Sequence, residues 1–357
     1  DLKEKLSVDV VTFADYEDVA AELQRISATS EPIGMDARLA SVAIYRAAGG
    51  PQVQREKSPV ADWKAIKGPK EIEHYAAAMA RDGVALLRLR RWLDAVGISK
   101  RASEVEIAEK LTAFRAEQEH YQGDSFPAIV GYRGNGAIVH YHAQPDTCAQ
   151  IDDSGILLLD SGGQYLDGTT DITRTFTLGQ PTEEEKLHFT LVLQGMIDLT
   201  LAKFPQGTTG VQLDGYARQP LWSHHLNYGH GTGHGVGYFL NVHEGPMSIS
   251  PNPNSAGPKV PLKPGMILSN EPGYYLAGKH GIRCENLVLI QEEAEGWLGF
   301  DTLTLFPFER NLIHIDLLSL AQKNWLNTYH EMVNEKIGEL LTDQDEVAWL
   351  AIACAPV

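Results

Sequence analysis

The sequence predicts an α+β protein, because strand-rich blocks are flanked by long helices. Short apolar runs broken by Gly-rich turns occupy residues 126–179 and 236–291, which is typical of strands joined by tight turns. Helical patterns cover residues 69–96, 182–204 and most of the last forty residues. No tandem repeat of 20–50 residues is visible. Strand blocks flanked by helices in this way are typical of the α+β class.

Residues 1–62 and 63–357 are predicted to belong to different domains. The first segment alternates short pieces, with a strand over 8–13 and helices over 16–26 and 38–50. Sixty residues of this kind make a weak core by themselves. We therefore interpret the first segment as the C-terminal remnant of a larger α/β domain that precedes the main domain.

Helix boundaries in the main domain carry capping signals. Ser103 with Glu106, and Thr182 with Glu185, match capping boxes that begin helices. Gly97 ends the long helix that precedes them. The remaining predicted elements are a helix over 211–224 and strands over 125–130, 137–141, 155–160, 172–178, 236–244, 266–275 and 282–291.

Composition excludes several classes of protein. The chain has 357 residues, enough for about two domains with a large core. Its 47 Asp and Glu residues against 30 Lys and Arg give a net charge of −17, which disfavours nucleic acid and anionic membranes as partners. Uninterrupted apolar runs stay short of the roughly 18 residues of a membrane span. Cys148, Cys284 and Cys354 are odd in number and far apart, which favours a reducing compartment over a disulfide framework.

The first residues leave the compartment open. They read DLKEKLSVDV, with neither Met nor a basic-then-apolar signal pattern. We interpret this end as the interior of a longer chain or as a processed terminus. The predicted compartment is the cytoplasm, with loss of a targeting signal as the alternative.

Two aspartates are predicted to face each other on neighbouring strands. Asp160 ends the apolar run GILLLD, and Asp171 lies eleven residues further on, before a β-prone segment. Facing carboxylates repel each other unless a proton or a cation lies between them. For either residue alone, a solvated turn or strand-end aspartate is the simpler interpretation.

Histidines gather in the Gly-rich segment HGTGHGVGYFLNVHEGP. His230, His234 and His243 belong to it, and its glycines allow the backbone to approach a ligand closely. His230 and His234 have the spacing of a zinc-binding helix. However, HGTGH lacks the Glu of HExxH and is too rich in Gly for a helix, so we reject that motif.

Two glutamates complete the candidate ligands. Glu271 and Glu285 each lie in an apolar strand pattern, where a buried carboxylate needs a partner. Together with Asp160, Asp171 and one histidine they provide four carboxylates and one imidazole. Such a set suits two divalent cations, which bridging carboxylates hold roughly 3.5–4 Å apart. The sequence therefore predicts a dinuclear metal site.

At these residues the chain resembles the pita-bread metallopeptidases, the family that includes methionine aminopeptidase, prolidase and aminopeptidase P. The resemblance rests on LLLDSGGQYLDGTTDITRTF, GHGVGYFLNVHEGP, NEPGYY and GIRCEN. It is strongest to the three-domain type of Xaa-Pro aminopeptidase and covers about residues 63–357. It implies a pita-bread catalytic domain with a helical tail, preceded by the remnant of a creatinase-like domain.

The resemblance also implies the metal ligands. They would be Asp160, Asp171, His234, Glu271 and Glu285, with Asp171 and Glu285 bridging two divalent ions. The family leans to Mn²⁺, and a carboxylate-rich set also permits Co²⁺ or Zn²⁺.

Further residues take implied roles in the cleft. His243 matches the histidine that contacts the substrate carbonyl or the tetrahedral intermediate, and His230 and His140 match accessory histidines of the substrate cleft. His243, Glu271 and His230 form the predicted catalytic set, with Glu271 as proton shuttle. Arg283 and Tyr275 match residues that support the ligands from behind.

The predicted reaction is hydrolysis of the bond between an N-terminal residue and a following proline, by a metal-bridging hydroxide. The resemblance implies peptides with proline at the second position as substrates, and a homodimer. Prolidase, which takes Xaa-Pro dipeptides, is the nearest alternative. The segment between His234 and His243 is longer than in prolidases, which argues against it. A non-catalytic binding module of the same fold is the other alternative, and the intact ligand positions disfavour it.

Overall fold

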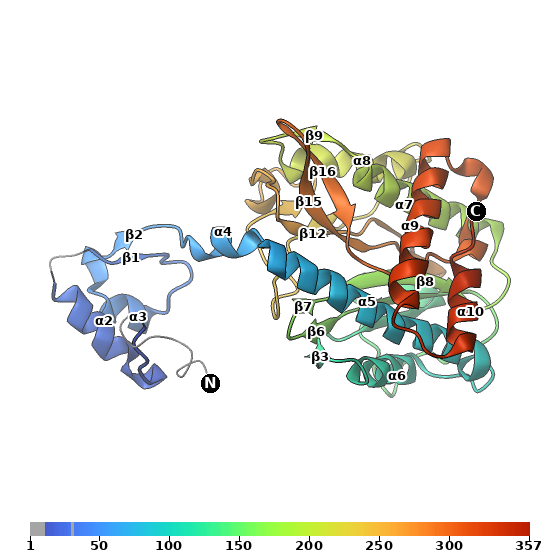
Figure 1. Cartoon of the computed structure of the whole chain (residues 1–357), viewed down its shortest axis with the longest axis horizontal. Helices are drawn as coiled ribbons and strands as arrows, with labels where there is room; N and C mark the ends of the chain where they lie inside the picture. Colours follow the sequence, from blue (N-terminus) through green and yellow to red (C-terminus); the bar gives the residue numbers. More distant parts are fainter. Residues whose placement is uncertain (1–10, 30–31) are drawn as a thin grey trace. The chain divides into compact units, whose positions relative to one another are not determined.

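The computed structural model describes residues 11–29 and 32–357. The chain divides into two compact units, Asp1–Trp63 and Lys64–Val357. Figure 1 traces their elements along the sequence. No helix within the described residues has both the length and the hydropathy needed to cross a membrane.

The first unit has little interior of its own. β1 (Gly34–Met35) pairs in parallel with β2 (Gln54–Arg55). The same unit contains the helices α2 (Val19–Ser27) and α3 (Val42–Ala47). Only four of its described residues are buried, and Tyr16 is 88% exposed. The expected strand over 8–13 is absent at residues 11–13, and residues 8–10 lie outside the described residues.

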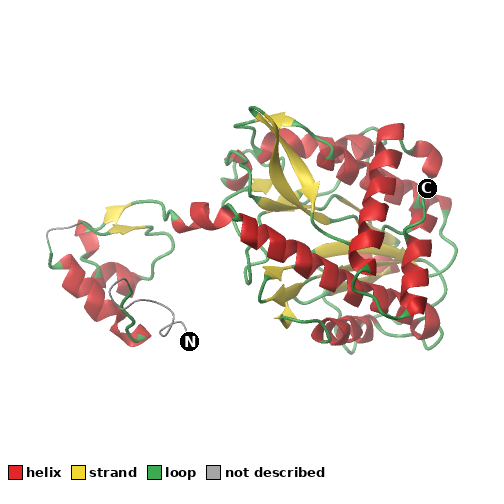
Figure 2. Cartoon of the chain, viewed as in Figure 1, coloured by secondary structure: helices red, strands yellow, loops and turns green. Residues whose placement is uncertain are grey.

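Two antiparallel sheets form the centre of the second unit, and helices lie around them (Figure 2). The first sheet has the order β4 (Ile129–Tyr132), β5 (Ile156–Ser161) and β8 (Ile172–Thr177). The second has the order β12 (Ile267–Asn270), β15 (Asn286–Ala294), β16 (Trp297–Thr302) and β9 (Phe204–Pro205). Smaller pairings join β3 (Tyr121–Asp124), β6 (Gly163–Tyr165) and β7 (Gly168–Thr169), β10 (Gly233–His234) and β11 (Ser248–Ile249), and β13 (Gly273–Leu276) and β14 (His280–Arg283).

The helices of this unit begin where the capping signals predict. Thr182 and Glu185 form a reciprocal capping box at the start of α7, and the Ser103 hydroxyl accepts from the Glu106 amide at the start of α6. Helix α5 packs against α6, α9 and α10, and α7 packs against α8 and α9. The helices are α5 (Pro69–Trp92), α6 (Glu104–Ala116), α7 (Glu183–Thr200), α8 (Gly210–Trp222), α9 (Leu320–Gly338) and α10 (Gln344–Ala353). The predicted mixture of helices and sheets is confirmed.

Two predicted strands are wrong. Residues 236–244 form a loop, because Phe239, Leu240 and Asn241 all adopt left-handed backbone angles, with φ of 50°, 66° and 55°. The Tyr75 hydroxyl on α5 donates to the Gly237 carbonyl and holds this loop. Residues 137–141 also form no strand, since a 3₁₀ turn ends there.

A buried arginine joins the two central sheets at one end. The guanidinium of Arg174 on β8 donates to the carbonyl oxygens of Thr173 at 3.0 Å and of Glu285 at 2.6 Å. It also donates to Asn286 Oδ1 on β15 at 2.8 Å and to the Phe306 carbonyl at 2.7 Å. These bonds fix the ends of β8 and β15 against each other, and the residues beside them face a shared cavity.

Candidate metal centre

A cavity of about 460 Å³ lies where the two central sheets meet. Its polar lining contains every ligand predicted from the sequence, and its apolar lining comes mainly from the segments on either side of β4 and from the 236–244 loop. The lining residues that matter here are Asp160, Asp171, His234, Glu271, Glu285, Arg283, His140, His230, His243, Phe126, Ile129, Val139 and Val242.

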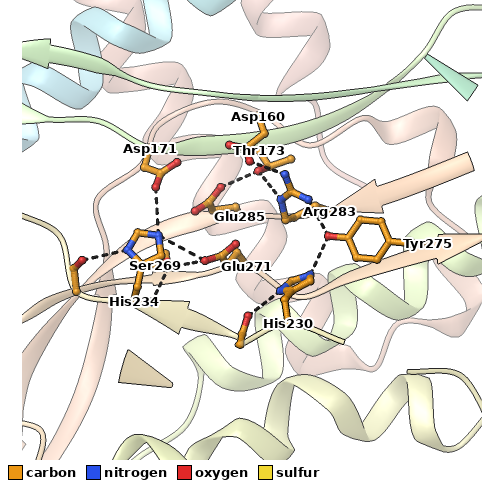
Figure 3. A network of polar contacts seen from close by, with 12 residues as sticks. Asp160, Asp171, Thr173, His230, His234, Ser269, Glu271, Tyr275, Arg283 and Glu285 are labelled. Carbon is orange, nitrogen blue, oxygen red and sulfur yellow. Dashed lines mark hydrogen bonds and ion pairs between the residues drawn. The ribbon is translucent and has the colours of Figure 1, made fainter. Parts of the chain in front are cut away.

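Asp160 and Asp171 enter the cavity from the β5–β8 side (Figure 3). Asp160 is near the end of β5, directly opposite Thr173 of β8, and Asp171 is the residue before β8 begins. Both are buried. Asp160 Oδ2 accepts from Arg283, whereas its Oδ1 is buried without any hydrogen-bond partner.

Glu285 approaches from the second sheet. It lies between β14 and β15 and is 1% exposed. The Thr173 hydroxyl donates to Glu285 Oε2 at 2.7 Å, and the Glu285 amide donates to the Thr173 carbonyl at 3.2 Å. Thr173 thus holds Glu285 opposite Asp160 and Asp171, although its hydroxyl brings no compensating charge.

His234 belongs to the short strand β10, which crosses close to β12. A Cβ added at the neighbouring Gly233 would lie 1.9 Å from the Ser269 carbonyl oxygen, so only glycine permits this approach. His234 Nδ1 faces the Gly235 carbonyl at 3.0 Å. Since a carbonyl only accepts, Nδ1 carries a proton, so Nε2 is the ring atom that would contact a cation once it is deprotonated.

Nε2 of His234 points to two carboxylates. It lies 3.4 Å from Asp171 Oδ2 and 3.5 Å from Glu271 Oε1. The Ser269 hydroxyl accepts from the His234 amide and donates to Glu271 Oε1, and this fixes both residues. Asp171, His234 and Glu285 each offer one ligand atom within 4.8 Å of the others.

The electrostatics of the cluster favour protonation when no cation is present. Burial raises the pKa of Glu271 to about 7, against the opposing charges of His234 and Arg283. Burial also raises the pKa of Asp171 and holds that of Glu285 well above its usual range. Burial alone would lower the pKa of His234, but the contact with Asp171 and the charge of Glu271 outweigh it and raise this pKa to about 9.

A chain of hydrogen bonds runs behind the ligands from Asp160 to His230. Arg283 donates to Asp160, to the Thr173 hydroxyl at 3.0 Å and to the Tyr275 hydroxyl at 2.7 Å. The Tyr275 hydroxyl in turn lies 2.8 Å from His230 Nε2. Because His230 Nδ1 donates to the Gly231 carbonyl, its Nε2 must accept from Tyr275. Burial lowers the pKa of His230 to about 4, so its ring is neutral at physiological pH.

His243 and His140 line the same cavity without a ligand-type contact to the carboxylates. The ring of His243 stands edge-on to His234, with centroids 4.1 Å apart, and its side chain is exposed. His140 is also exposed. Burial lowers the pKa of His243, and the neighbouring His234 lowers it further. The structure therefore brings the sequence-predicted site residues to one cavity, except Tyr275, which lies behind its lining and contacts Arg283 and His230.

The residues present fit a pair of divalent cations. Four carboxylates and one imidazole converge, and the guanidinium of Arg283 forms an ion pair with one of the carboxylates, Asp160. A buried carboxylate oxygen without a hydrogen-bond donor, as at Asp160 Oδ1, is costly unless a cation contacts it. Hard and borderline cations prefer this donor set.

Sequence reasoning missed the hydroxyl groups that orient the ligands. Thr173 and Ser269 each contact two of the site's residues. A signal existed for Thr173, because it is two residues after Asp171 in a strand and therefore on the same face. The same signal existed for Ser269, which is two residues before Glu271 in the predicted strand over 266–275. Only its bond to His234, 35 residues away in the chain, lacked a local signal.

Comparison with known proteins identifies the family. Residues 73–292 match metallopeptidase family M24, and residues 296–357 match the C-terminal region of peptidase M24. The chain is 44% identical over 96% of its length to a probable Xaa-Pro aminopeptidase P of Laccaria bicolor, and 43% identical over 99% to one of Fusarium vanettenii. It spans only 55% and 60% of the length of these relatives.

Solved structures give the same result. An X-prolyl aminopeptidase from Caenorhabditis elegans, described as cytosolic with a di-nuclear active site, superposes with a TM-score of 0.88 at 35% identity, over 97% of this chain and 58% of that one. A prolidase from Pyrococcus furiosus superposes with a TM-score of 0.67 at 26% identity, over 82% of this chain and 80% of that one.

We predict that the metal-free protein loses stability as pH rises from about 6.5 to 9, above the range in which buried histidines of lowered pKa such as His230 and His330 titrate. Glu271 and His234 both have raised pKa values, so the folded state holds more protons than the unfolded state in this range. Unfolding then becomes easier as pH increases. Thermal unfolding in EDTA should show a falling Tm, and the increase in Tm on adding Mn²⁺ should grow with pH because the cation displaces these protons. A Tm in EDTA that rises over this pH range would contradict the raised pKa values of Glu271 and His234.

Proposed function

The chain belongs to metallopeptidase family M24, and from this we propose that it is the catalytic part of a dinuclear Xaa-Pro aminopeptidase. The observation that carries the proposal is the convergence of four carboxylates and the Nε2 side of His234 in one cavity. The relatives named Xaa-Pro aminopeptidase P and the di-nuclear C. elegans enzyme support the same activity. A non-catalytic module of this fold has no need of this ligand set.

We propose Asp160, Asp171, His234, Glu271 and Glu285 as the residues that hold two cations. Asp171 and Glu285 take the bridging positions, which is supported by their short separation from each other and from His234. Mn²⁺ is the proposed metal, with Co²⁺ and Zn²⁺ as alternatives. When bound, such a pair supplies a water that is deprotonated near neutral pH and stabilises negative charge on oxygen.

The protein residues supply proton transfer and orientation. Glu271 lines the cavity beside His234, so its carboxylate can take a proton from the attacking water and deliver it to the prolyl nitrogen. His243 is free of the carboxylates and faces the cavity, so its ring can donate to the oxygen of the attacked carbonyl. Arg283 and Tyr275 keep Asp160 and His230 in place.

His230 has a structural role in this arrangement and takes no part in proton transfer. Both of its ring nitrogens are already bonded, to the Gly231 carbonyl and to the Tyr275 hydroxyl. We therefore propose that it lines the cleft together with His140. A direct catalytic role for His230 would require Tyr275 to release Nε2.

The proposed substrates are peptides with proline at the second position. Among the arginines near the site, Arg283 is occupied with Asp160 and Arg174 with the core. Neither is available to bind the free carboxylate of an Xaa-Pro dipeptide, so the proposal favours longer peptides over the prolidase alternative. The closer match to the C. elegans enzyme than to the P. furiosus prolidase agrees with this choice.

The setting of the enzyme is proposed from its relatives. Since the chain spans little more than half of them, residues 1–62 are proposed to be the end of a preceding domain. Cytoplasmic location is proposed because the C. elegans enzyme is described as cytosolic. A homodimer is proposed from the family resemblance alone.

We predict that metal binding and catalysis separate between two variants. Asp171→Ala should lose both bound metal and activity, because Asp171 is a proposed bridging ligand. His243→Ala should keep about two Mn²⁺ per chain and lose on the order of 10²-fold in kcat, as removal of one oxyanion donor does. Elemental analysis and steady-state kinetics of both variants make the test. Loss of metal from His243→Ala would show that the roles of His234 and His243 are exchanged.

We predict that Arg-Pro-Pro is cleaved better than Arg-Pro, with release of free arginine, and that Arg-Ala-Ala is a poor substrate. Contacts beyond proline should raise kcat/KM, since remote binding energy supports the reacting centre. Release of arginine by the Mn²⁺-loaded chain is the measurement. Faster cleavage of the dipeptide would assign the chain to prolidase, and equal cleavage of the alanine peptide would contradict selection for proline.

A further inference from the structure

One of the buried carboxylates outside the cavity belongs to Glu104, the first residue of α6. Glu104 is fully buried, and within the described ranges no Lys, Arg or His side chain forms an ion pair with it. A buried charge of this kind is tolerated only when hydrogen bonds replace its water. The hydrogen-bond donors to Glu104 therefore show which segment of the chain it holds in place.

All side-chain and backbone donors to this carboxylate come from one segment, residues 132–149. Oε1 accepts from the Tyr132 amide at 2.7 Å and from Asn135 Nδ2 at 3.0 Å. Oε2 accepts from the Tyr141 hydroxyl and from the Ala149 amide, both at 2.8 Å. The Glu104 amide also donates to the Ala149 carbonyl at 3.0 Å. One side chain thus holds the beginning, middle and end of this 132–149 loop.

The same loop is fixed on its other side by strand β14. A Cβ added at Gly281 would lie 1.7 Å from the Gly136 carbonyl oxygen, so the two backbones are in direct contact. β14 continues into Arg283, which supports Asp160. The 132–149 loop is therefore held between Glu104 and a strand that leads into the metal site.

Two residues of the 132–149 loop face the cavity. Val139 and His140 belong to its lining, and neither is in a regular helix or strand. No helix or strand pairing holds these two residues, so the course of the loop depends on its hydrogen bonds to Glu104 and on its contact with β14. Glu104 itself does not line the cavity.

We propose that Glu104 is a positioning residue for substrate binding, which fixes the 132–149 loop so that His140 and Val139 form one wall of the cleft. The inference rests on the proposed function, because it assigns the peptide to the cavity. Glu104 acts through the loop and touches no reacting atom. Its removal should therefore weaken binding of substrate and leave the chemical step unchanged.

Glu104→Gln is the direct test, because it keeps the size of the side chain and replaces one acceptor with an NH₂ group that faces existing donors. In the full chain loaded with Mn²⁺, we expect metal content unchanged and kcat within about 2-fold of wild type. KM for Arg-Pro-Pro should rise on the order of 10-fold, as expected when buried donors lose their acceptor. Amide hydrogen exchange within 132–149 should accelerate.

Two further variants make the test specific. In a chain that already carries His140→Ala, Glu104→Gln should raise KM little further, since both changes act on the same wall of the cleft. Glu106→Gln, in the same helical turn but on the surface beside Lys100, should change neither KM nor exchange. If Glu104→Gln does not fold, Tyr141→Phe removes a single donor and should give a smaller effect of the same kind.

The outcomes separate this inference from the proposed function. Unchanged exchange of residues 132–149 in Glu104→Gln would overturn the positioning role, as would full additivity of its KM effect with that of His140→Ala. A wild-type chain that binds two metals and cleaves no Xaa-Pro peptide would instead contradict the proposed function. In that case the exchange measurement, which needs no substrate, still decides whether Glu104 fixes the loop.

Discussion

Burial of several carboxylates in one cavity is the constraint on which this structure depends. Asp160, Asp171 and Glu285 are buried within one cavity, and Glu271 joins them from the end of β12. In the absence of a cation, burial and neighbouring charge raise the pKa of Asp171, Glu271 and Glu285. A fold that keeps these groups together gains stability when cations replace the protons.

The surrounding structure holds the carboxylates mainly with neutral donors. Thr173 and Ser269 donate hydroxyl groups to Glu285 and Glu271, and Arg283 alone brings a fixed positive charge, to Asp160. Neutral donors orient the oxygens without adding positive charge, so the burial of these carboxylates is offset by bound protons or by cations. The two central sheets contribute from opposite sides, and Arg174 keeps their ends in register from behind. Glu104 shows the same principle outside the cavity, where neutral donors surround a buried charge.

Local patterns in the sequence predicted much of this arrangement. Apolar runs and turn residues located β5 and β8, and their antiparallel pairing places Asp160 near Asp171 as expected. The predicted strand over 236–244 was wrong because its left-handed turn depends on contacts from α5 and on Gln164, which are distant in the chain. The partners of Glu104 lie 28–45 residues away, so no local pattern identifies it. Long-range hydrogen bonds, rather than periodicity, define the walls of the cleft.

Anomalous X-ray diffraction from crystals of the Mn²⁺-loaded chain tests the central claim most directly. The account predicts two manganese peaks in the cavity, roughly 3.5–4 Å apart, with carboxylate oxygens of Asp171 and Glu285 in contact with both. Asp160 should contact one peak, and His234 and Glu271 the other. A single peak, or manganese bound away from these five residues, would contradict a dinuclear centre built from this carboxylate cluster.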